Sequence, residues 1–365
     1  MPPFACKLEM NHLRRYAPRT MPRIIDLRSD VKTRPTPEMW RAMTEAPLGD
    51  DAHREDPTAE RLQELAAGML GKEAALFTTS GTQGNLLGIL ALEERGGVII
   101  GPEDIHVSYS ELDGYRHVAG MSLVNVPSSR GVPDVLEIRR TLEAISDRGE
   151  NARLLWMENT HNHGGGIAIT GEAMAQMRAL ADEFGLKIHV DGSRIFNAAT
   201  CLNVPVSALA RDADTLQFCL SKGLAAPVGS VLVGEAATIA RARKHRKMLG
   251  GQMRQTGVLA AAGIVALERM STRLQEDHDN ARLLAEGLAH IPGIEIDVDL
   301  VQTNLVYCTV SSAHGPAREV LDKLEPEGIL AYSTLGPRSL RFVLHYEITR
   351  DDVEAALKVI KRVMG

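Results

Sequence analysis

Two charged residues lie at or just after the ends of apolar runs that are typical of buried strands. In open α/β sheets, ligands bind at the carboxyl ends of such strands. Lys222 follows the run Thr215–Leu220, and Asp191 closes the run Ile188–Val190. A lysine at the end of a buried strand is unfavourable unless it is paired or covalently used. Removal from water lowers the pKa of such an amine and prepares it to form a Schiff base. The aspartate could be structural, a metal ligand or the partner of a protonated ring nitrogen.

A third stretch, Ser80-Gly81-Thr82, lies between the apolar run Ala74–Phe77 and a helical pattern over Gly84–Glu94. Such a turn presents backbone N–H groups and a hydroxyl to an anion, with the helix dipole behind them. A plain helix cap has the same residues, so the turn alone decides nothing. Together, an anion-binding turn, an acid and a lysine that can form a Schiff base are the groups that a protein needs to bind pyridoxal phosphate.

Other chemistry is disfavoured by what the sequence lacks. It contains no GxGxxG, GxxxxGK[ST], HExxH or GxSxG pattern. His163-Gly164-Gly165-Gly166 is similar to an esterase oxyanion loop, but no nucleophile elbow accompanies it. His161 and His163 could form a metal pair, yet no further ligand pattern supports one, and we expect no metal.

Composition bounds the class of protein. The 365 residues are 44% hydrophobic and 24% charged, which is ordinary globular composition. With 41 basic and 47 acidic side chains the net charge is 41 − 47 = −6, which disfavours a nucleic-acid binder. No apolar stretch is long enough to cross a membrane. Four cysteines without close spacing favour reduced thiols and a cytoplasmic protein.

The positions of the apolar runs predict how the chain is divided. Nearly continuous apolar runs alternate with helical patterns up to about residue 270, which predicts a mostly parallel sheet covered on both faces. A long helical pattern runs from about Gln255 to His290, and a smaller α+β unit follows it. We therefore predict a large cofactor-binding domain over 24–270 and a small C-terminal domain over 271–365. The basic segment 1–23 is predicted to be an extension or arm.

Several motifs occur in one order from about Ile24 to the C-terminus. They include Asp26-Leu27-Arg28-Ser29-Asp30, Glu55-Asp56-Pro57-Thr58, Glu158-Asn159-Thr160-His161-Asn162, Asp191-Gly192-Ser193-Arg194 and Ser221-Lys222-Gly223. On these motifs the sequence resembles the L-threonine aldolases, in the β-eliminating lyase group of fold-type I pyridoxal-phosphate enzymes. The resemblance implies cleavage of L-threonine, L-allo-threonine or a related β-hydroxy-α-amino acid. The products would be glycine and an aldehyde.

The resemblance also implies roles for individual residues. Lys222 would hold the cofactor covalently, Asp191 would pair with its ring nitrogen, and His106 would stack on its ring. The implied cofactor-binding set is Ser80, Gly81, Thr82, His106, Asp191, Arg194, Lys222 and Arg254. The implied substrate-binding set is Ser29, Arg194, Arg341 and His161. Arginine forks suit a planar carboxylate, and Arg254 is the member expected from a neighbouring subunit.

Three departures from the family pattern lie on the side that faces substrate. His53-Arg54 stands where the family often has Tyr-Gly, His163 stands where many members have arginine, and no histidine occurs near Arg148. One interpretation is an aldolase in which His53 or a water acts as the base. Others are β-elimination, racemisation, transamination, or a cofactor-free oligomeric scaffold.

By the same resemblance we expect a homo-oligomer, a dimer or a homotetramer, with the site near a subunit interface. The expected ligand is a small amino acid, with neither nucleic acid nor membrane as partner. The preferred aldehyde product and the stereochemical preference are not readable from the residues.

Overall fold

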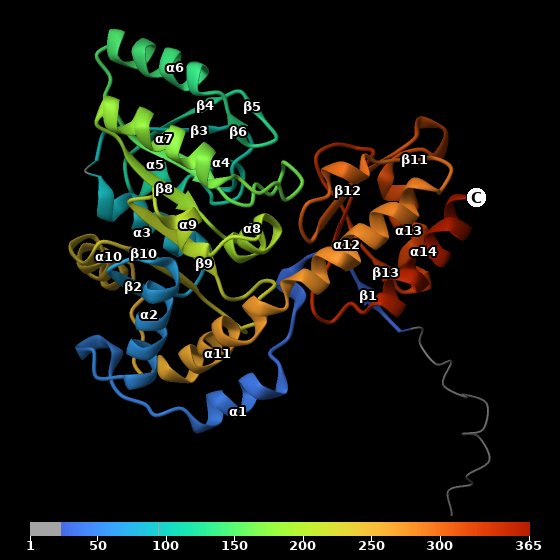
Figure 1. The fold of residues 1–365 in the computed structure, drawn as a ribbon, viewed down its shortest axis with the longest axis horizontal. Coiled ribbons are helices and arrows are strands. Elements are labelled where there is room, and N and C mark those ends of the chain that lie inside the picture. Colours follow the sequence, from blue (N-terminus) through green and yellow to red (C-terminus); the bar gives the residue numbers. More distant parts are fainter. Residues whose placement is uncertain (1–22, 94) are drawn as a thin grey trace, which may run out of the picture.

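The computed structural model describes residues 23–93 and 95–365, which form a larger and a smaller lobe (Figure 1). The larger lobe holds a seven-stranded sheet in the order β2-β10-β9-β8-β7-β3-β4. Its strands are β2 (Ala74–Thr78), β3 (Val98–Pro102), β4 (Ser122–Val126), β7 (Ala152–Glu158), β8 (Lys187–Asp191), β9 (Thr215–Cys219) and β10 (Ser230–Gly234). Neighbours are parallel except the two pairs that β10 makes with β2 and β9. The predicted mostly parallel sheet is confirmed.

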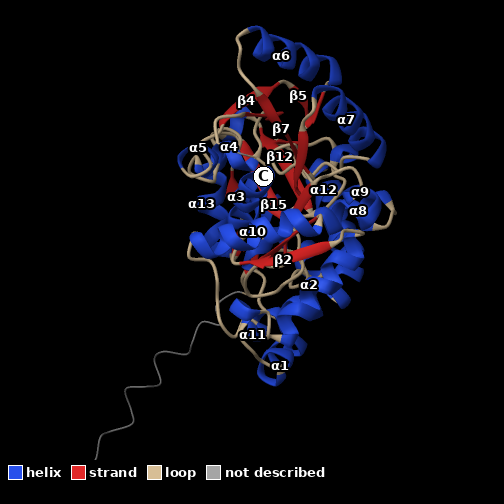
Figure 2. Cartoon of the chain, turned by 90° about the vertical axis from the view of Figure 1, so that its left-hand side faces the viewer, coloured by secondary structure: helices blue, strands red, loops and turns tan. Residues whose placement is uncertain are grey.

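Helices pack against this sheet (Figure 2), which explains why most residues of its strands, apart from the edge strand β4, are buried. In chain order they are α1 (Pro37–Glu45), α2 (Pro57–Leu70), α3 (Gly81–Leu92), α4 (His106–Tyr109), α5 (Gly114–His117), α6 (Val135–Asp147), α7 (Gly171–Phe184), α8 (Ile195–Leu202), α9 (Val206–Ala210), α10 (Ala236–Met248) and α11 (Gly257–Glu268). Local sequence sets their ends: the Asp56 side chain accepts the N–H of Ala59 at the start of α2, and Gly71 ends it at φ 65°.

The smaller lobe is an antiparallel sheet in the order β11-β12-β15-β14, packed with three helices. Its strands are β11 (Ile294–Glu295), β12 (Leu305–Val310), β14 (Tyr332–Ser333) and β15 (Ser339–Val343), and its helices are α12 (Leu274–Ala289), α13 (Ala317–Leu324) and α14 (Arg350–Met364). A short strand near the start of the chain, β1 (Ile25–Asp26), pairs with β13 (Ile329–Leu330). Two further short strands, β5 (Ser128–Ser129) and β6 (Val132–Pro133), form a hairpin on the larger lobe.

The long helix expected over 255–290 is in fact two helices. A single 3₁₀ turn, Met270–Thr272, separates α11 from α12. The Ser271 and Thr272 hydroxyls donate to the carbonyls of Leu267 and Arg269 (2.5 and 2.8 Å), and such bonds compete with the helical ladder.

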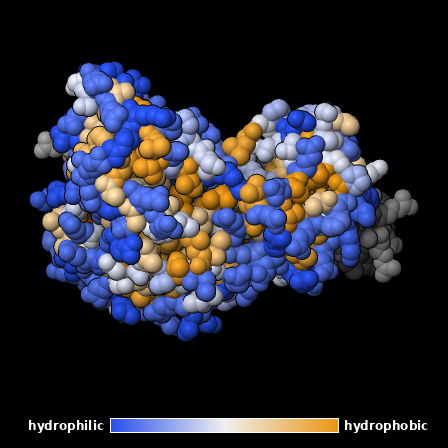
Figure 3. Space-filling view, turned by 45° about the horizontal axis from the view of Figure 1, so that its top comes forward, coloured by the Kyte–Doolittle hydropathy of each residue, from blue (hydrophilic) through white to orange (hydrophobic). Residues whose placement is uncertain are grey.

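The two lobes have separate hydrophobic cores. Met270 and Leu274 pack in the larger core, and Ala281 packs in the smaller one. Ile25 and Leu27 also pack in the smaller core, although the sequence pattern assigns everything from residue 24 to the larger domain. On the face shown in Figure 3, hydrophobic residues gather over the middle of the molecule, where the lobes meet.

The predicted N-terminal arm lies outside the described residues, apart from Arg23. The Arg23 guanidinium donates to the Asp352 carboxylate (2.8 Å) on α14. Among the described helices, none combines the length and apolar character needed to span a membrane.

Candidate active site

A cavity of about 130 Å³ opens at the carboxyl ends of β7 and β8, between the two lobes. Its walls bring together six of the residues singled out from the sequence, namely Ser29, His106, Asp191, Arg194, Lys222 and Arg341. Parallel strands deliver their carboxyl ends to one edge of a sheet, so residues far apart in the chain meet there. We call this cavity the lysine pocket.

Asp191 ends β8 and is buried. Its Oδ2 accepts from Asn85 (2.9 Å), and its Oδ1 accepts from the Gln217 side chain (2.5 Å) and the Ser193 N–H (3.1 Å). Burial alone would raise the pKa of Asp191, but the charges of His106 and Lys222 and these hydrogen bonds hold it below its ordinary value. A buried anion of this kind suits a protonated ring nitrogen.

His106 is held beside Asp191 by two glutamates. Its backbone N–H donates to Glu158 Oε2, and its Nδ1 lies the same 2.7 Å from Glu111 Oε1. Burial works against a charged imidazole, yet Glu111 and Asp191 raise the pKa of His106 above its ordinary value. Ligand-type atoms of His106, Glu111 and Asp191 lie within 4.8 Å of one another. The arrangement fixes the ring of His106 at the edge of the lysine pocket.

Lys222 lies in the turn that follows β9. Its backbone carbonyl accepts from the Thr33 hydroxyl (2.9 Å) and from the Ala225 N–H (2.8 Å). The residue is half-buried rather than fully buried, because it faces the lysine pocket. The turn therefore fixes the lysine backbone and leaves its amine within the cavity that also holds Asp191.

The Ser80-Gly81-Thr82 turn begins α3, three residues earlier than the helical pattern predicted. Ser80 caps the helix by accepting the Gln83 N–H (3.1 Å), and its neighbours Gly81 and Thr82 are at least partly exposed. A Cβ on Gly81 would approach Cys219 Sγ to 2.9 Å, so the backbone here lies close against β9. The open N-terminus of α3 suits a phosphate. With an acid and an amine in one cavity, the donor set fits pyridoxal phosphate.

Two arginines, Arg194 and Arg341, also line the lysine pocket and bring positive charge to it. Arg194 makes a bidentate ion pair with Asp30; burial alone would lower the pKa of Arg194, but the charge and hydrogen bonds of Asp30 raise it above its ordinary value. Arg341 on β15 donates to the Arg28 carbonyl (3.0 Å). Ser29, which lies between Arg28 and Asp30 in the sequence, also lines the lysine pocket.

Six predicted site residues do not line the lysine pocket, namely Ser80, Gly81 and Thr82 of the turn just described and His53, His161 and Arg254. His53 and Arg254 are exposed and share the carboxylate of Asp50, at 2.9 and 3.0 Å. The His161 side chain is buried, and its Nδ1 accepts the Gly164 N–H (2.9 Å) beneath the glycine-rich loop. Burial lowers the pKa of His161 to about 4.

Sequence reasoning missed the residues that position these groups. Glu158 is buried in the pocket wall, where burial and the nearby Asp191 raise its pKa to about 7. Glu158 begins the motif Glu158-Asn159-Thr160-His161-Asn162 and directly follows a predicted strand. An acid at the end of a predicted strand is the signal that could have identified it. Asn85 and Gln217 gave no such signal, because each meets its partner across 26 positions, and Glu111, five residues after His106, belongs to no quoted motif.

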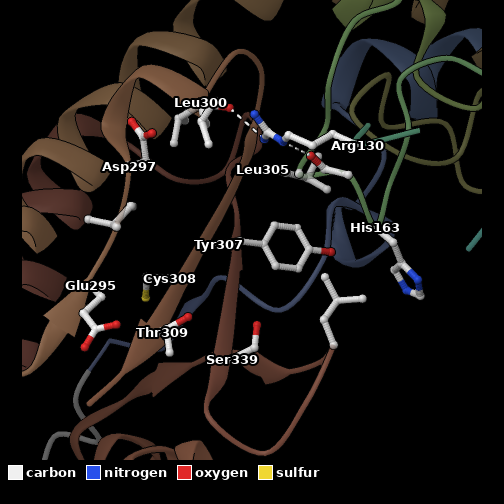
Figure 4. Close-up of a pocket in the computed structure, with 15 residues that line it drawn as sticks. Arg130, His163, Glu295, Asp297, Leu300, Leu305, Tyr307, Cys308, Thr309 and Ser339 are labelled. Carbon is white, nitrogen blue, oxygen red and sulfur yellow. Dashed lines mark hydrogen bonds between the residues drawn. The ribbon is translucent and has the colours of Figure 1, made fainter. Parts of the chain in front are cut away.

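A second cavity, of about 380 Å³, adjoins the lysine pocket between the lobes. Figure 4 shows Tyr307 of β12 projecting toward His163 of the larger lobe. Tyr307 is the cross-strand partner of Arg341, and His163 directly follows Asn162, another residue of the lysine pocket. Tyr109 stacks on His163 with ring centroids 4.0 Å apart. Neither Tyr307 nor Tyr109 was singled out from the sequence.

Comparisons with known proteins show which family and fold the chain is similar to. The family model described as beta-eliminating lyase matches residues 26–311. Low-specificity L-threonine aldolase 1 of Arabidopsis thaliana is 41% identical over 349 residues, covering 94% of this chain and 97% of that protein. Low specificity L-threonine aldolase of Escherichia coli K12 is 37% identical, covering 90% and 96%. The solved threonine aldolase of Leishmania major superposes with a TM-score of 0.79 at 19% identity, covering 93% and 99%.

Proposed function

The chain belongs to the beta-eliminating lyase family, and from that premise we propose that it is a pyridoxal-phosphate-dependent aldolase acting on L-threonine, L-allo-threonine or a related β-hydroxy-α-amino acid. Its products would be glycine and an aldehyde, which makes it a carbon–carbon lyase. One observation carries the proposal: Lys222, Asp191 and two arginines line a single cavity.

The residues of the lysine pocket divide the work. Lys222 would hold the cofactor covalently and give up its place to the amine of the substrate. When bound, pyridoxal phosphate accepts the electron pair that remains at Cα as the Cα–Cβ bond breaks. Asp191 would keep the proton on the ring nitrogen of the bound cofactor. Arg194 and Arg341 would hold the substrate carboxylate and so fix which bond at Cα is cleaved.

The base that takes the β-hydroxyl proton is proposed to be His53 or a water. The His53 ring is 70% exposed and pairs with the same Asp50 as Arg254, which is the residue expected to reach a neighbour's phosphate. We propose that this surface cluster, His53, Asp50 and Arg254, completes the site of a second copy in a homodimer or homotetramer. Placement at a subunit interface would give the two exposed residues, His53 and Arg254, and the partly buried Asp50 a common role.

A cytoplasmic location is proposed on the state of the thiols. Cys201, Cys219 and Cys308 are free cysteines, and two of them are buried. Free thiols in the described part of the chain are in keeping with a reducing compartment.

The test is to mix purified holoenzyme with L-threonine, L-allo-threonine, their D-isomers and L-phenylserine, and to measure aldehyde and glycine. Equal amounts of aldehyde and glycine are expected from at least one L-isomer. The visible absorbance of the bound cofactor, read in the same cuvette, reports whether the protein carries it.

Other outcomes would point elsewhere. Cofactor absorbance without glycine would contradict the aldolase, and assays for ammonia, pyruvate or inverted alanine would then separate elimination from racemisation. Amino transfer to a keto acid would identify a transaminase. A protein that does not retain pyridoxal phosphate would be the oligomeric scaffold instead.

A further inference from the structure

The segment Ile25–Thr33, here called the strap, runs from the smaller lobe to the larger one. On the smaller lobe β1 pairs with β13, and the Val343 N–H donates to the Leu27 carbonyl (2.8 Å). On the larger lobe the Thr33 hydroxyl donates to the Lys222 carbonyl (2.9 Å). The strap is therefore fixed at both ends as it passes the lysine pocket.

Asp30 is the buried centre of the strap. Its side chain has no exposed surface, and its oxygens accept from Arg194 Nε and Nη2, each at 2.7 Å. Asn304, which directly precedes β12, donates its amide to Asp30 Oδ2 (3.2 Å). Burial alone would raise the pKa of Asp30, but the charge and hydrogen bonds of Arg194 hold it well below its usual range. One carboxylate thus joins the strap to both lobes.

The contact with Asp30 decides which donors Arg194 offers to the lysine pocket. A guanidinium has five N–H donors in a planar fork, and Asp30 occupies the edge formed by Nε and Nη2. The edge formed by Nη1 and the second hydrogen of Nη2 has no acceptor among the described residues. Because Arg194 lines the lysine pocket, this free edge matches a second carboxylate there.

Arg341 is held by the same strap. Its Nη2 donates to the Arg28 carbonyl, two residues before Asp30. Its Nε is buried without a hydrogen-bond partner in the described chain. Asn304 and Arg341 both belong to the smaller lobe, so the strap contacts a cation of that lobe as well as Arg194, and both cations line the lysine pocket.

We propose that Asp30 is a positioning residue that fixes the free edge of Arg194 toward the substrate carboxylate and, through Asn304, aligns Arg341 of the smaller lobe with it. The inference rests on the proposed function, because it takes an amino acid as the ligand. Asp30 does not touch that ligand; it acts through the two arginines.

The test compares two ligands that differ in the carboxylate. Glycine has one and methylamine has none, and binding of each to holoenzyme is followed from the visible spectrum of the cofactor. The Asp30→Asn variant should bind glycine about 10- to 100-fold more weakly and methylamine almost as before, since charge-assisted hydrogen bonds are lost. An equal loss for both ligands would show a merely structural role and overturn the proposal.

Asp26→Asn is the matched control. Asp26 makes the same kind of bidentate pair with Arg28 (2.6 and 2.8 Å) on the same strap, but Arg28, unlike Arg194, does not line the lysine pocket. In this variant the ratio of glycine to methylamine affinity should stay within about twofold of the wild-type ratio, because a solvent-accessible ion pair contributes little. A control variant that loses as much discrimination as Asp30→Asn would contradict the proposal.

A double-variant cycle with Arg194→Lys tests the route of the effect. If Asp30 acts through Arg194, the double variant should discriminate no worse than Arg194→Lys alone, whereas additive losses would refute that route. If Asp30→Asn does not fold, Asn304→Ser removes one donor from the same carboxylate. The Asn304→Ser variant should bind glycine several-fold more weakly and methylamine almost as before. An unchanged ratio of glycine to methylamine affinity would count against the proposal.

These measurements separate this inference from the proposed function. Glycine has no Cα–Cβ bond to cleave, so a protein that binds glycine but releases no aldehyde from the hydroxy amino acids disproves the aldolase and leaves Asp30 testable. A protein that releases aldehyde with an unaltered ligand ratio in Asp30→Asn keeps the aldolase and removes the positioning role.

Discussion

The two walls of the site differ in how completely their polar groups are paired. On the cofactor wall, made by Asn85, His106, Glu111, Asp191 and Gln217, the side chains hydrogen-bond to one another or to neighbouring residues, and only Gln217 Oε1 is buried without a partner among the described residues. On the substrate wall, made by Thr160, Asn162, His163, Tyr307 and Arg341, each side chain has one buried polar atom without a partner in the same described set.

The hydrogen bonds of the cofactor wall are thus formed within the protein, whereas those of the substrate wall are completed when a ligand binds. A buried polar atom without a partner is unfavourable, so groups of this kind mark where a bound molecule supplies the missing hydrogen bonds. The cofactor wall is satisfied because its partners come from five segments of one lobe. The substrate wall joins the loop Thr160–His163 of the larger lobe to two strands of the smaller lobe, β12 and β15.

Removal of the lysine amine should have the largest effect and tests the cofactor wall directly. Lys222→Ala is expected to lower turnover by at least about 1,000-fold, because covalent attachment of the cofactor is lost. The visible absorbance of the lysine-bound cofactor should disappear with it. A variant that keeps both absorbance and activity would end the assignment of Lys222.

Neutralising the acid of the cofactor wall should have the next largest effect. Asp191→Asn keeps the shape but loses the charge that holds the ring-nitrogen proton, and we expect kcat to fall about 100- to 1,000-fold. Asp214→Asn is the control: Asp214 accepts from Arg178 (2.8 Å), far from the lysine pocket, at the other end of the sheet. It should cost about 1–3 kcal/mol of stability and leave kcat within a few-fold. Equal losses of kcat would show that Asp191 is only structural.

The same contrast explains what the sequence could predict. Lys222, Asp191 and Arg194 each follow an apolar run that forms a strand, so strand order and the family resemblance place them at one sheet edge. The parallel sheet and the second, smaller unit follow from the same hydrophobic pattern.

What the sequence could not show depends on long-range pairing. Asp30 meets Arg194 across 164 positions and Asn304 across 274, and no local pattern announces either contact. Tyr307 becomes a neighbour of the site only because β12 pairs with β15. The break between α11 and α12 was missed because two hydroxyls compete for backbone carbonyls within an otherwise continuous helical pattern.

A change on the substrate wall should be milder, and it should act on substrate binding. Tyr307→Phe removes only the hydroxyl, whose oxygen is buried without a partner in the described chain. We expect a 2- to 10-fold higher KM with little change in kcat, since one neutral hydrogen bond is worth about 0.5–1.5 kcal/mol. Tyr332→Phe is the control, because Tyr332 also flanks Arg341 in the sheet but is exposed. A change in kcat alone would contradict a binding role.

The smallest expected effect concerns pH and the histidine of the substrate wall. Burial lowers the pKa of His163 to about 4 in the folded protein, below its ordinary value of 6.5. Between those values the unfolded chain binds more protons, so this histidine contributes stability that is present above pH 6.5 and is lost as the pH falls toward 4.

His163→Gln should therefore flatten the dependence of the unfolding free energy on pH between 6.5 and 4, as measured by denaturant titration. His290→Gln, on the smaller lobe with its ring exposed, controls for the substitution itself. On the cofactor wall side, His189 is fully buried between Thr215 and Asn85, and burial lowers its pKa to about 4 as well. Since His189 keeps its own pH dependence in the variant, the slope should decrease without vanishing. An unchanged slope would mean that His163 is exposed to solvent in solution, and the substrate wall would then be open rather than awaiting its ligand.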